Sequence, residues 1–288
     1  MKAKSFAKIN LGLEIVGKRP DGYHNIRTLF QSIDLADTIE LEPLPDGSVR
    51  LEGDEPAVEW DATNLVHRAA RLLQNRTGTR AGVRIRVAKA VPPGKGLGGG
   101  SSNAALTLYA LNRLWSLGLG PETLKELALS LGSDVPYFLE GGLCLGQSRG
   151  EALTRLQDFP PLPCVLVLPP YPILTAGVYA EVAPSLTSES KDSKIMRFLD
   201  TGDFGPLKND LELVIFQRYP ELEGFKKFFR DQGAILSLVT GSGSAVFGLF
   251  TDGDQARKAL GKLRGKSEAR LAETLPREAY WAQVGAGV

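Results

Sequence analysis

The sequence predicts an α+β protein of two domains, and three observations lead to this fold class. Segments with an apolar residue at every second position, typical of strands, occur beside segments whose apolar residues recur every three or four positions, typical of helices. The length of 288 residues allows one large or two ordinary domains. Prolines interrupt regular patterning in LQDFPPLPC near residue 160. We therefore expect domains at 1–158 and 159–288.

Composition and charge exclude several classes of protein. Hydrophobic residues make up 43% of the chain and charged residues 23%, which is typical of a soluble globular protein. The 34 basic residues nearly balance the 33 acidic ones, so we expect no nucleic-acid partner. Cys144 and Cys164 lack metal-type spacing and are expected to be reduced, which favours a cytoplasmic location. The longest apolar run, LPCVLVLPPYPIL, is too short and proline-rich to span a membrane, and we expect no targeting segment or membrane partner.

The first 53 residues predict a β-meander. Apolar residues alternate in KSFAKINLGLEIVG, and Pro20, Asp21 and Gly22 then predict a turn. A second strand follows in HNIRTLFQSIDL and a third in DTIELEP. A second PDG turn at 45–47 leads to a short strand, VRLEG.

Helices and one more strand complete the first half. NLVHRAARLLQNRTG has helical spacing, with Thr63 or Asn64 as cap and Gly78 after its end. GVRIRVAKAV alternates as a half-buried strand. Helical spacing resumes after residue 103, where Ser101 or Ser102 is a suitable N-cap, and another helix runs from 121 to 131.

The segment VPPGKGLGGGSS joins that strand to the helix after it, and it contains five glycines. A glycine-rich turn before a helix gathers unpaired backbone N–H groups at the positive end of the helix dipole, which suits phosphate. One or two glycines would fit a merely tight turn, but five favour the anion site. The pattern G-x-G-x-x-G is present, but no acidic residue follows about 20 positions later at a strand end, so a dinucleotide site is disfavoured. The spacing also excludes a Walker loop.

The second half predicts a separate α+β layer. A strand, CVLVLPP, is followed by helical patterns near 175–182, 194–200 and 210–230. An apolar strand, a small glycine loop in TGSGSAVFGLF and the helix DQARKALGKLR come next. No internal repeat is visible.

Three motifs, in order along the chain, resemble those of the GHMP kinases. The glycine segment is similar to the signature P-x-x-x-G-L-G-[GS]-[GS]-S, and AKINLGLEI and TGSGSAVFG are similar to the other two motifs. The resemblance implies a ribosomal protein S5 domain 2-like N-terminal domain, a ferredoxin-like C-terminal domain, and ATP with Mg²⁺ as cofactors. The implied ATP-binding residues are Pro92, Gly94, Gly96, Leu97, Gly98, Gly99, Gly100, Ser101 and Ser102.

Within this superfamily, KRPDGYHNIRTLFQSIDLADTIELE, LGSDVPYFLEGG and PLKNDLE resemble the family of kinases that act on 4-diphosphocytidyl-2-C-methyl-D-erythritol in the non-mevalonate isoprenoid pathway. The implied reaction is transfer of the ATP γ-phosphoryl group to a hydroxyl of that small molecule. Two positions depart from the family pattern. Val239 replaces a frequent methionine, and Lys95 is expected to place a charge beside the nucleotide.

The same resemblance implies roles for individual residues. A lone lysine in a strand usually faces solvent, but the likeness implies that Lys8 and Asn10, on one face of the first strand, line the acceptor-hydroxyl pocket. Asp134 suits an ordinary turn, but it is implied to be the catalytic base, with Lys8 polarising the hydroxyl oxygen. Either Ser101 or Ser102 could contact Mg²⁺ or phosphate.

Recognition of the cytidine end is also implied. Tyr23 and His24 would otherwise be ordinary residues of an exposed turn, but the likeness implies that Tyr23 stacks on cytosine and His24 hydrogen-bonds its edge. Tyr179 is expected to close from the other side. The remaining implied substrate contacts are Thr175, Asn209 and the second glycine loop at Gly241.

Two alternatives remain open from the sequence alone. Another kinase of the superfamily, such as homoserine or phosphomevalonate kinase, would share the glycine loops but would not need Gly22, Tyr23 and His24. A non-catalytic ligand sensor could dispense with Lys8 and Asp134, and both are present. We expect a monomer or a weak homodimer.

Overall fold

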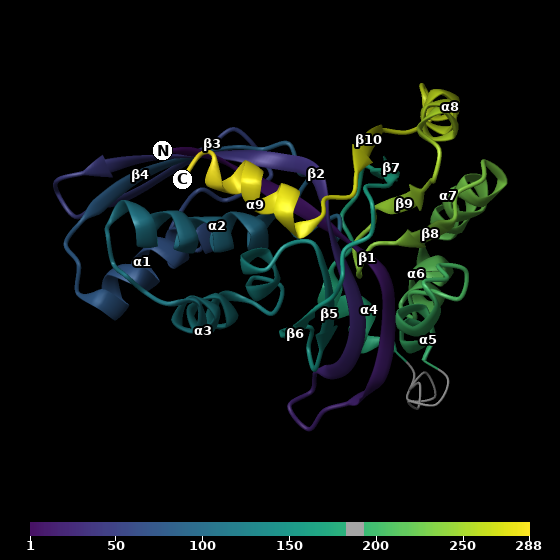
Figure 1. Cartoon of the computed structure of the whole chain (residues 1–288), viewed down its shortest axis with the longest axis horizontal. Helices are drawn as coiled ribbons and strands as arrows, with labels where there is room; N and C mark the ends of the chain where they lie inside the picture. Colours follow the sequence, from purple (N-terminus) through teal and green to yellow (C-terminus); the bar gives the residue numbers. More distant parts are fainter. Residues whose placement is uncertain (183–192) are drawn as a thin grey trace.

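A long antiparallel hairpin of β1 (Lys2–Lys18) and β2 (His24–Leu44) is the central element of the fold. The computed structural model describes residues 1–182 and 193–288. The hairpin runs between the two halves of the molecule, and its tip projects beyond both (Figure 1). The second and third strands expected from the sequence are therefore one continuous strand, β2.

The hairpin belongs to a six-stranded sheet, and here the expected meander is wrong. The strand order is β3-β4-β2-β5-β6, with β1 paired to β2. Strand β3 (Val49–Gly53) lies parallel to β4 (Gly82–Ala88), which itself occupies the place beside β2. Strands β5 (Leu143–Gln147) and β6 (Ala152–Arg155) complete the sheet. Neither was predicted.

Three helices cover one face of this sheet in the expected places. Helix α1 (Leu65–Thr77) is capped by Asn64 and ends at Gly78, and α3 (Pro121–Leu131) ends before Gly132. Helix α2 (Gly99–Leu114) begins earlier than expected, with Gly98 rather than Ser101 or Ser102 at its N-cap. A short 3₁₀ turn, η1 (Pro136–Leu139), follows α3.

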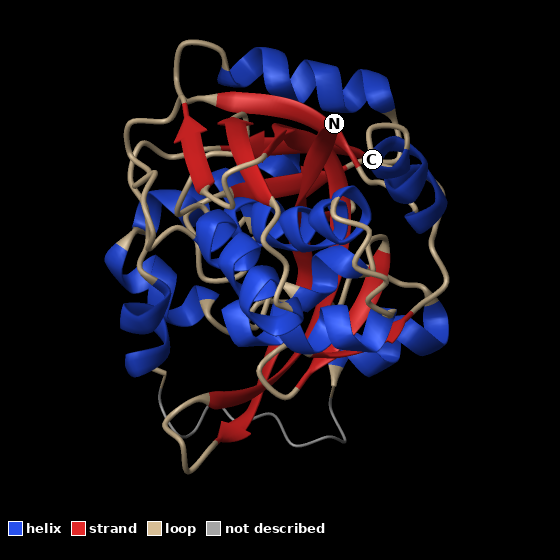
Figure 2. Ribbon diagram, turned by 90° about the vertical axis from the view of Figure 1, so that its left-hand side faces the viewer, coloured by secondary structure: helices blue, strands red, loops and turns tan. Residues whose placement is uncertain are grey.

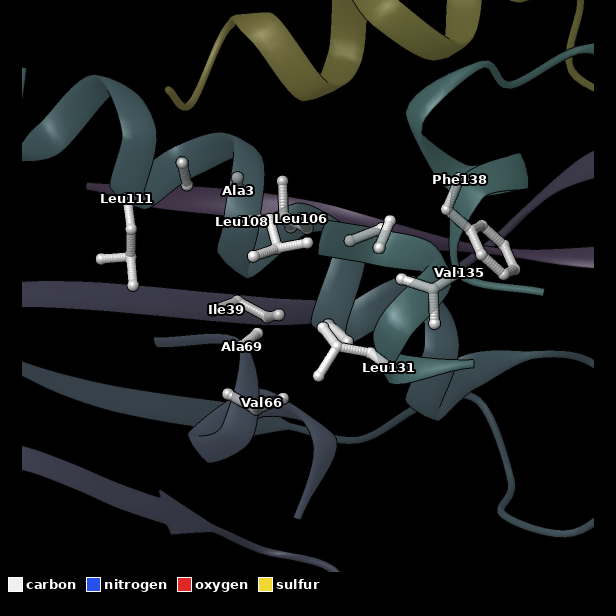
Figure 3. Close-up of a cluster of buried hydrophobic side chains, with 14 of the residues drawn as sticks. Ala3, Ile39, Val66, Ala69, Leu106, Leu108, Leu111, Leu131, Val135 and Phe138 are labelled. Carbon is white, nitrogen blue, oxygen red and sulfur yellow. The ribbon is translucent and has the colours of Figure 1, made fainter. Parts of the chain in front are cut away.

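The buried face of α2 fixes the position of its N-terminus. Leu108 and Leu111 of α2 pack in one apolar cluster with Ile39 of β2 and with Val66 and Ala69 of α1 (Figure 3). Burial of these side chains anchors the helix on the sheet. The glycine segment immediately before α2 is therefore held at a defined place.

The second half is a four-stranded sheet with helices, as expected. The strand order is β10-β7-β9-β8, from β7 (Pro163–Val167), β8 (Leu236–Val239), β9 (Val246–Leu249) and β10 (Ala269–Glu273). Helices α4 (Thr175–Ala180), α5 (Lys194–Thr201) and α8 (Gly253–Leu263) lie where helical spacing was seen. The pattern at 210–230 is two helices, α6 (Glu212–Arg218) and α7 (Pro220–Asp231), because Pro220 starts a new one.

The chain returns to the first half at its end. Helix α9 (Arg277–Gly285) lies along the side of α2, away from α8, and the two termini are near each other (Figures 1 and 2). Tyr280 and Val284 of α9 are buried in the same cluster as the α2 side chains. The α+β class predicted from the sequence is confirmed. No helix among the described residues is long and apolar enough to cross a membrane.

Candidate active site

A cavity of about 940 Å³ lies where the hairpin, the glycine segment and the second half meet. Of the site residues predicted from the sequence, all except Ser102 and Asn209 line it. The predicted residues that do so are Lys8, Asn10, Tyr23, His24, Pro92, Gly94, Gly96, Leu97, Gly98, Gly99, Gly100, Ser101, Asp134, Thr175, Tyr179 and Gly241. Residues as far apart in sequence as Lys8 and Gly241 thus converge on one space.

The glycine segment contacts the second glycine loop, and two of its glycines have a steric requirement. Gly96 and Gly98 have φ angles of 77° and 72°, in the left-handed region. A Cβ at Gly96 would lie 2.1 Å from the carbonyl oxygen of Thr240, and one at Gly98 would lie 2.7 Å from Phe138. Glycine at 96 therefore allows the segment to pass close to the second half, and glycine at 98 allows it to pass close to Phe138 of the first half.

The two loop serines have different environments. Ser101, in the first turn of α2, lines the cavity. Ser102 is 1% exposed, and its hydroxyl donates to the carbonyl oxygen of Phe6 at 2.6 Å and lies 2.7 Å from the hydroxyl of Ser5. Ser102 therefore links α2 to β1, and of the two serines Ser101 is the one whose side chain adjoins the cavity.

A buried carboxylate holds the start of the glycine segment. Asp37 of β2 accepts hydrogen bonds from the backbone N–H groups of Ala90 and Val91, at 2.8 and 2.7 Å. It also accepts from the Lys89 ammonium and from the Asn103 side chain. These contacts connect β2, the segment entrance and α2.

Lys8, Asn10 and Asp134 form what we call the reacting end of the cavity. Lys8 Nζ donates to Asn10 Oδ1 at 2.7 Å and lies 3.6 Å from Asp134 Oδ2. Lys8 and Asn10 are 3% and 2% exposed, and burial lowers the pKa of Lys8 although Asp134 opposes this shift. A buried ammonium beside a carboxylate open to the cavity can polarise an oxygen while the carboxylate takes a proton.

Tyr23, His24 and Tyr179 lie at the tip of the hairpin. We call this region the base end, because the sequence predicts that it binds the cytosine base. The rings of His24 and Tyr179 lie 5.6 Å apart, and Tyr23 is 57% exposed. The Arg149 guanidinium lies 5.2 Å from the centre of the Tyr23 ring. Burial and the nearby Lys18 ammonium lower the pKa of His24. Burial raises the pKa of Tyr179, so its hydroxyl stays protonated.

The second glycine loop is supported from behind. Asn209 lies outside the cavity lining, and its side-chain amide donates to the carbonyl oxygens of Val239 and Gly241, at 2.9 and 2.7 Å. Thr175 at the start of α4 shares a 2.7 Å hydrogen bond with Ser242. Asn209 therefore positions this loop rather than lining the cavity.

Lys95 departs from its expected role. It lines the cavity, but its ammonium donates to the carbonyl oxygens of Pro169 and Tyr171, at 2.5 and 2.6 Å. Its charge is therefore directed at the segment after β7 and ties the glycine segment to the second half. Burial lowers the pKa of Lys95.

Sequence reasoning missed several charged or polar members of this region. Lys18, Asp21 and Arg149 line the cavity, and Thr28 and Asp37 are buried behind it. The period-two pattern placed Thr28 on a strand but carried no information on its partner. Among the described residues, no group of three or more His, Cys, Asp or Glu side chains has the arrangement of a metal site.

Comparison with known families gives two matches in chain order. The family described as GHMP kinases N terminal domain matches residues 64–142. The family described as GHMP kinases C terminal matches residues 195–269. Together they include the glycine segment, Asp134 and the second glycine loop.

Individual relatives are similar over nearly the whole chain. The 4-diphosphocytidyl-2-C-methyl-D-erythritol kinase of Pelotomaculum thermopropionicum is 45% identical over 270 residues, which cover 92% of this chain and 94% of that protein. A crystal structure of 4-(cytidine 5'-diphospho)-2C-methyl-D-erythritol kinase is 38% identical, with a TM-score of 0.82 and coverage of 95% of this chain and 99% of that one. Homoserine kinase from Cytophaga hutchinsonii, at 18% identity, a TM-score of 0.68 and coverage of 97% and 96%, shares the fold.

Proposed function

The chain belongs to the GHMP kinases and, among them, to the 4-diphosphocytidyl-2-C-methyl-D-erythritol kinases, and we propose a mechanism on this premise. The reaction transfers the γ-phosphoryl group of ATP to a hydroxyl of 4-diphosphocytidyl-2-C-methyl-D-erythritol, a step of non-mevalonate isoprenoid synthesis. The observation that carries the assignment of residues is the convergence of Lys8, Asp134 and the glycine segment on one cavity that also contains the base end.

Asp134 acts as the general base in this mechanism. Its carboxylate takes the proton of the acceptor hydroxyl as the oxygen forms a bond to the γ-phosphorus. The bond from that phosphorus to the bridging oxygen breaks, and ADP leaves. Lys8, 3.6 Å from Asp134, polarises the attacking oxygen and offsets the charge that develops on the phosphoryl oxygens. The low exposure of Lys8 strengthens both effects because the surroundings screen its charge poorly.

The glycine segment binds the ATP phosphates. Gly98, Gly99 and Gly100 lie at the N-terminus of α2, where unpaired N–H groups and the helix dipole attract anions. When bound together with ATP, Mg²⁺ would supply positive charge that offsets the charge of the phosphates. We assign Ser101 as the loop hydroxyl that contacts the phosphates or the ion, because it adjoins the cavity.

The cytidine end of the acceptor occupies the base end of the cavity. Tyr23 and Tyr179 offer ring faces for cytosine, and His24 offers a ring nitrogen to its edge. Arg149 and Lys18 supply positive charge beside these rings, which suits an acceptor that carries a diphosphate. The elongated acceptor would then extend from the hairpin tip to Lys8.

The test is an ATP-dependent phosphorylation assay with a panel of acceptors: the diphosphocytidyl substrate, homoserine, mevalonate phosphate and galactose. We expect turnover with the diphosphocytidyl compound and little with the others. A preference for another acceptor would contradict the assigned substrate, and no turnover with any would contradict the kinase assignment.

A further inference from the structure

Thr28 on β2 lies directly behind the reacting end, in contact with Asn10. It is 0% exposed and pairs with Leu13 across the hairpin. Its hydroxyl Oγ1 lies 2.8 Å from the backbone carbonyl oxygen of Gly12 and 2.8 Å from Asn10 Nδ2. A shift of register between Asn10 and Gly12 brings both groups to one hydroxyl.

The chemistry of these three groups permits one arrangement of hydrogens. A carbonyl oxygen only accepts hydrogen bonds, so the Thr28 hydroxyl must donate its single hydrogen to the Gly12 carbonyl oxygen. The Thr28 oxygen is left as an acceptor, and the Asn10 amide must therefore present its NH₂ group to it. The other end of that amide, Oδ1, is thereby turned toward Lys8.

The Lys8 ammonium requires the same orientation of the Asn10 amide as Thr28 does. An ammonium only donates, so it requires Oδ1 of Asn10, and the Nζ–Oδ1 distance is 2.7 Å. With the amide reversed, an NH₂ group would face the buried ammonium and repel it. Thr240 makes a longer 3.3 Å contact with the same Oδ1, so its hold on the amide is weaker.

We propose that Thr28 is a positioning residue for phosphoryl transfer: through Asn10 it fixes the site and orientation of the Lys8 ammonium. The inference rests on the proposed role of Lys8 in that reaction. The relay runs from Gly12 through Thr28 and Asn10 to Lys8 and ends beside Asp134, entirely within described residues. Because Thr28 is buried behind the cavity and does not line it, Thr28 contacts neither ligand and acts on the chemical step rather than on binding.

The test compares Thr28→Val, which keeps the shape and removes the hydroxyl, with Thr28→Ser, which keeps the hydroxyl. We expect Thr28→Val to lower kcat about 10- to 100-fold, which is less than the ~10²- to 10⁴-fold contribution of a positioned proton-transfer group, because Thr28 acts only through Asn10 and Lys8. The KM values for ATP and acceptor should change less than about threefold, as expected when only transition-state contacts are lost. Thr28→Ser should restore most of kcat, and Thr28→Cys, a weaker donor and acceptor, should fall between the two.

A control and a double variant separate positioning from a loss of stability. Thr107→Val removes an equally buried hydroxyl that donates to the Asn103 carbonyl oxygen within α2, and it should keep kcat. In an Asn10→Ala background, Thr28→Val should have little further effect on kcat, because the relay is already broken. If Thr28→Val alone fails to fold, kcat of Thr28→Cys should still lie below that of Thr28→Ser.

Two results would overturn the inference: parent-like kcat in Thr28→Val, or a full additional loss in the Asn10→Ala background. Both require an active parent enzyme. An inactive parent would instead contradict the proposed function, so the two failures are distinguishable.

Discussion

The reacting end and the base end of the cavity are built in opposite ways. At the reacting end, Lys8 and Asn10 are almost wholly buried in a paired strand, and each polar atom has a defined partner. At the base end, Tyr23 is more than half exposed at a hairpin tip, and Lys18 beside it is exposed. The first end can hold atoms in fixed geometry, and the second can admit and release a large ligand. We therefore expect the first to control kcat and the second to control KM for the acceptor.

Breaking the reacting end should give the largest effect. Lys8→Met and Asp134→Asn should each lower kcat by about 10²- to 10⁴-fold, because each removes a group that acts only in the transition state. ATP affinity, measured by calorimetric titration, should stay within a few-fold. Lys2→Met is a matched control, since Lys2 is an exposed lysine of the same strand that pairs with Glu40. Full turnover by either reacting-end variant would contradict the assigned chemistry.

Breaking the base end should change binding instead. Tyr23→Ala or Tyr179→Ala should remove roughly 1–3 kcal/mol of stacking. This corresponds to about a 5- to 150-fold rise in the acceptor KM, with kcat and the ATP KM nearly unchanged. Tyr179→Ala should have the larger effect of the two, because Tyr179 also packs against His24.

Steady-state kinetics of both variants, with CDP and UDP as inhibitors of the parent, measures this effect. CDP should compete better than UDP. Equal inhibition by the two nucleotides, or a parent-like acceptor KM in both variants, would place the cytosine pocket elsewhere.

The sequence predicted those residues of the two ends that belong to local motifs, and it missed those whose roles depend on partners distant in the chain. The glycine segment, Lys8 and Tyr23 were identified because each belongs to a local motif with a local physical reason. Thr28 and Asp37 were missed because their roles depend on strand pairing and on a bulge that the period-two pattern does not encode. Ser102 was grouped with Ser101, but one step along an α-helix is a rotation of about 100°, which turns it toward β1.

Long-range pairing also explains the errors in the fold. The strand VRLEG was predicted at the correct residues, but the predicted meander paired it with the strand before it. Its actual partner is β4, about 30 residues later in the chain, and local patterning does not identify so distant a partner. Helix α9 packs on the first half although it follows the second, so contacts rather than chain order decide which core it joins.

The glycine segment connects the two ends, and its glycines should differ in their effect on stability. Gly98→Ala should lower the free energy of unfolding by about 1–2 kcal/mol or more, because its φ of 72° is costly for any other residue and the new Cβ would meet Phe138. Gly100→Ala is the matched variant, since no atom lies within 4 Å of a Cβ at that position. Denaturant unfolding measures both. Equal stability of the two variants would show that the segment is not constrained at Gly98.

The smallest expected effect tests the electrostatics of the base end. Burial and the Lys18 ammonium both lower the pKa of His24, and burial is the larger cause. Lys18→Met removes the second cause only, so the pKa of His24 should rise but stay below its ordinary value. The protein has two histidines, so an NMR titration of their ring protons follows both, and the pKa of His67, on α1, is an internal reference that should not change.

Because Lys18 is exposed, the difference in the His24 pKa between parent and variant should shrink in about 1 M salt, where the screening length falls to roughly 3 Å. The Lys8–Asp134 pair should be less sensitive to salt because Lys8 is buried, so kcat should change little over the same range of salt. An unchanged His24 pKa in Lys18→Met would mean that the exposed charges of the hairpin tip do not reach the base end, and the contrast with the reacting end would then rest on burial alone.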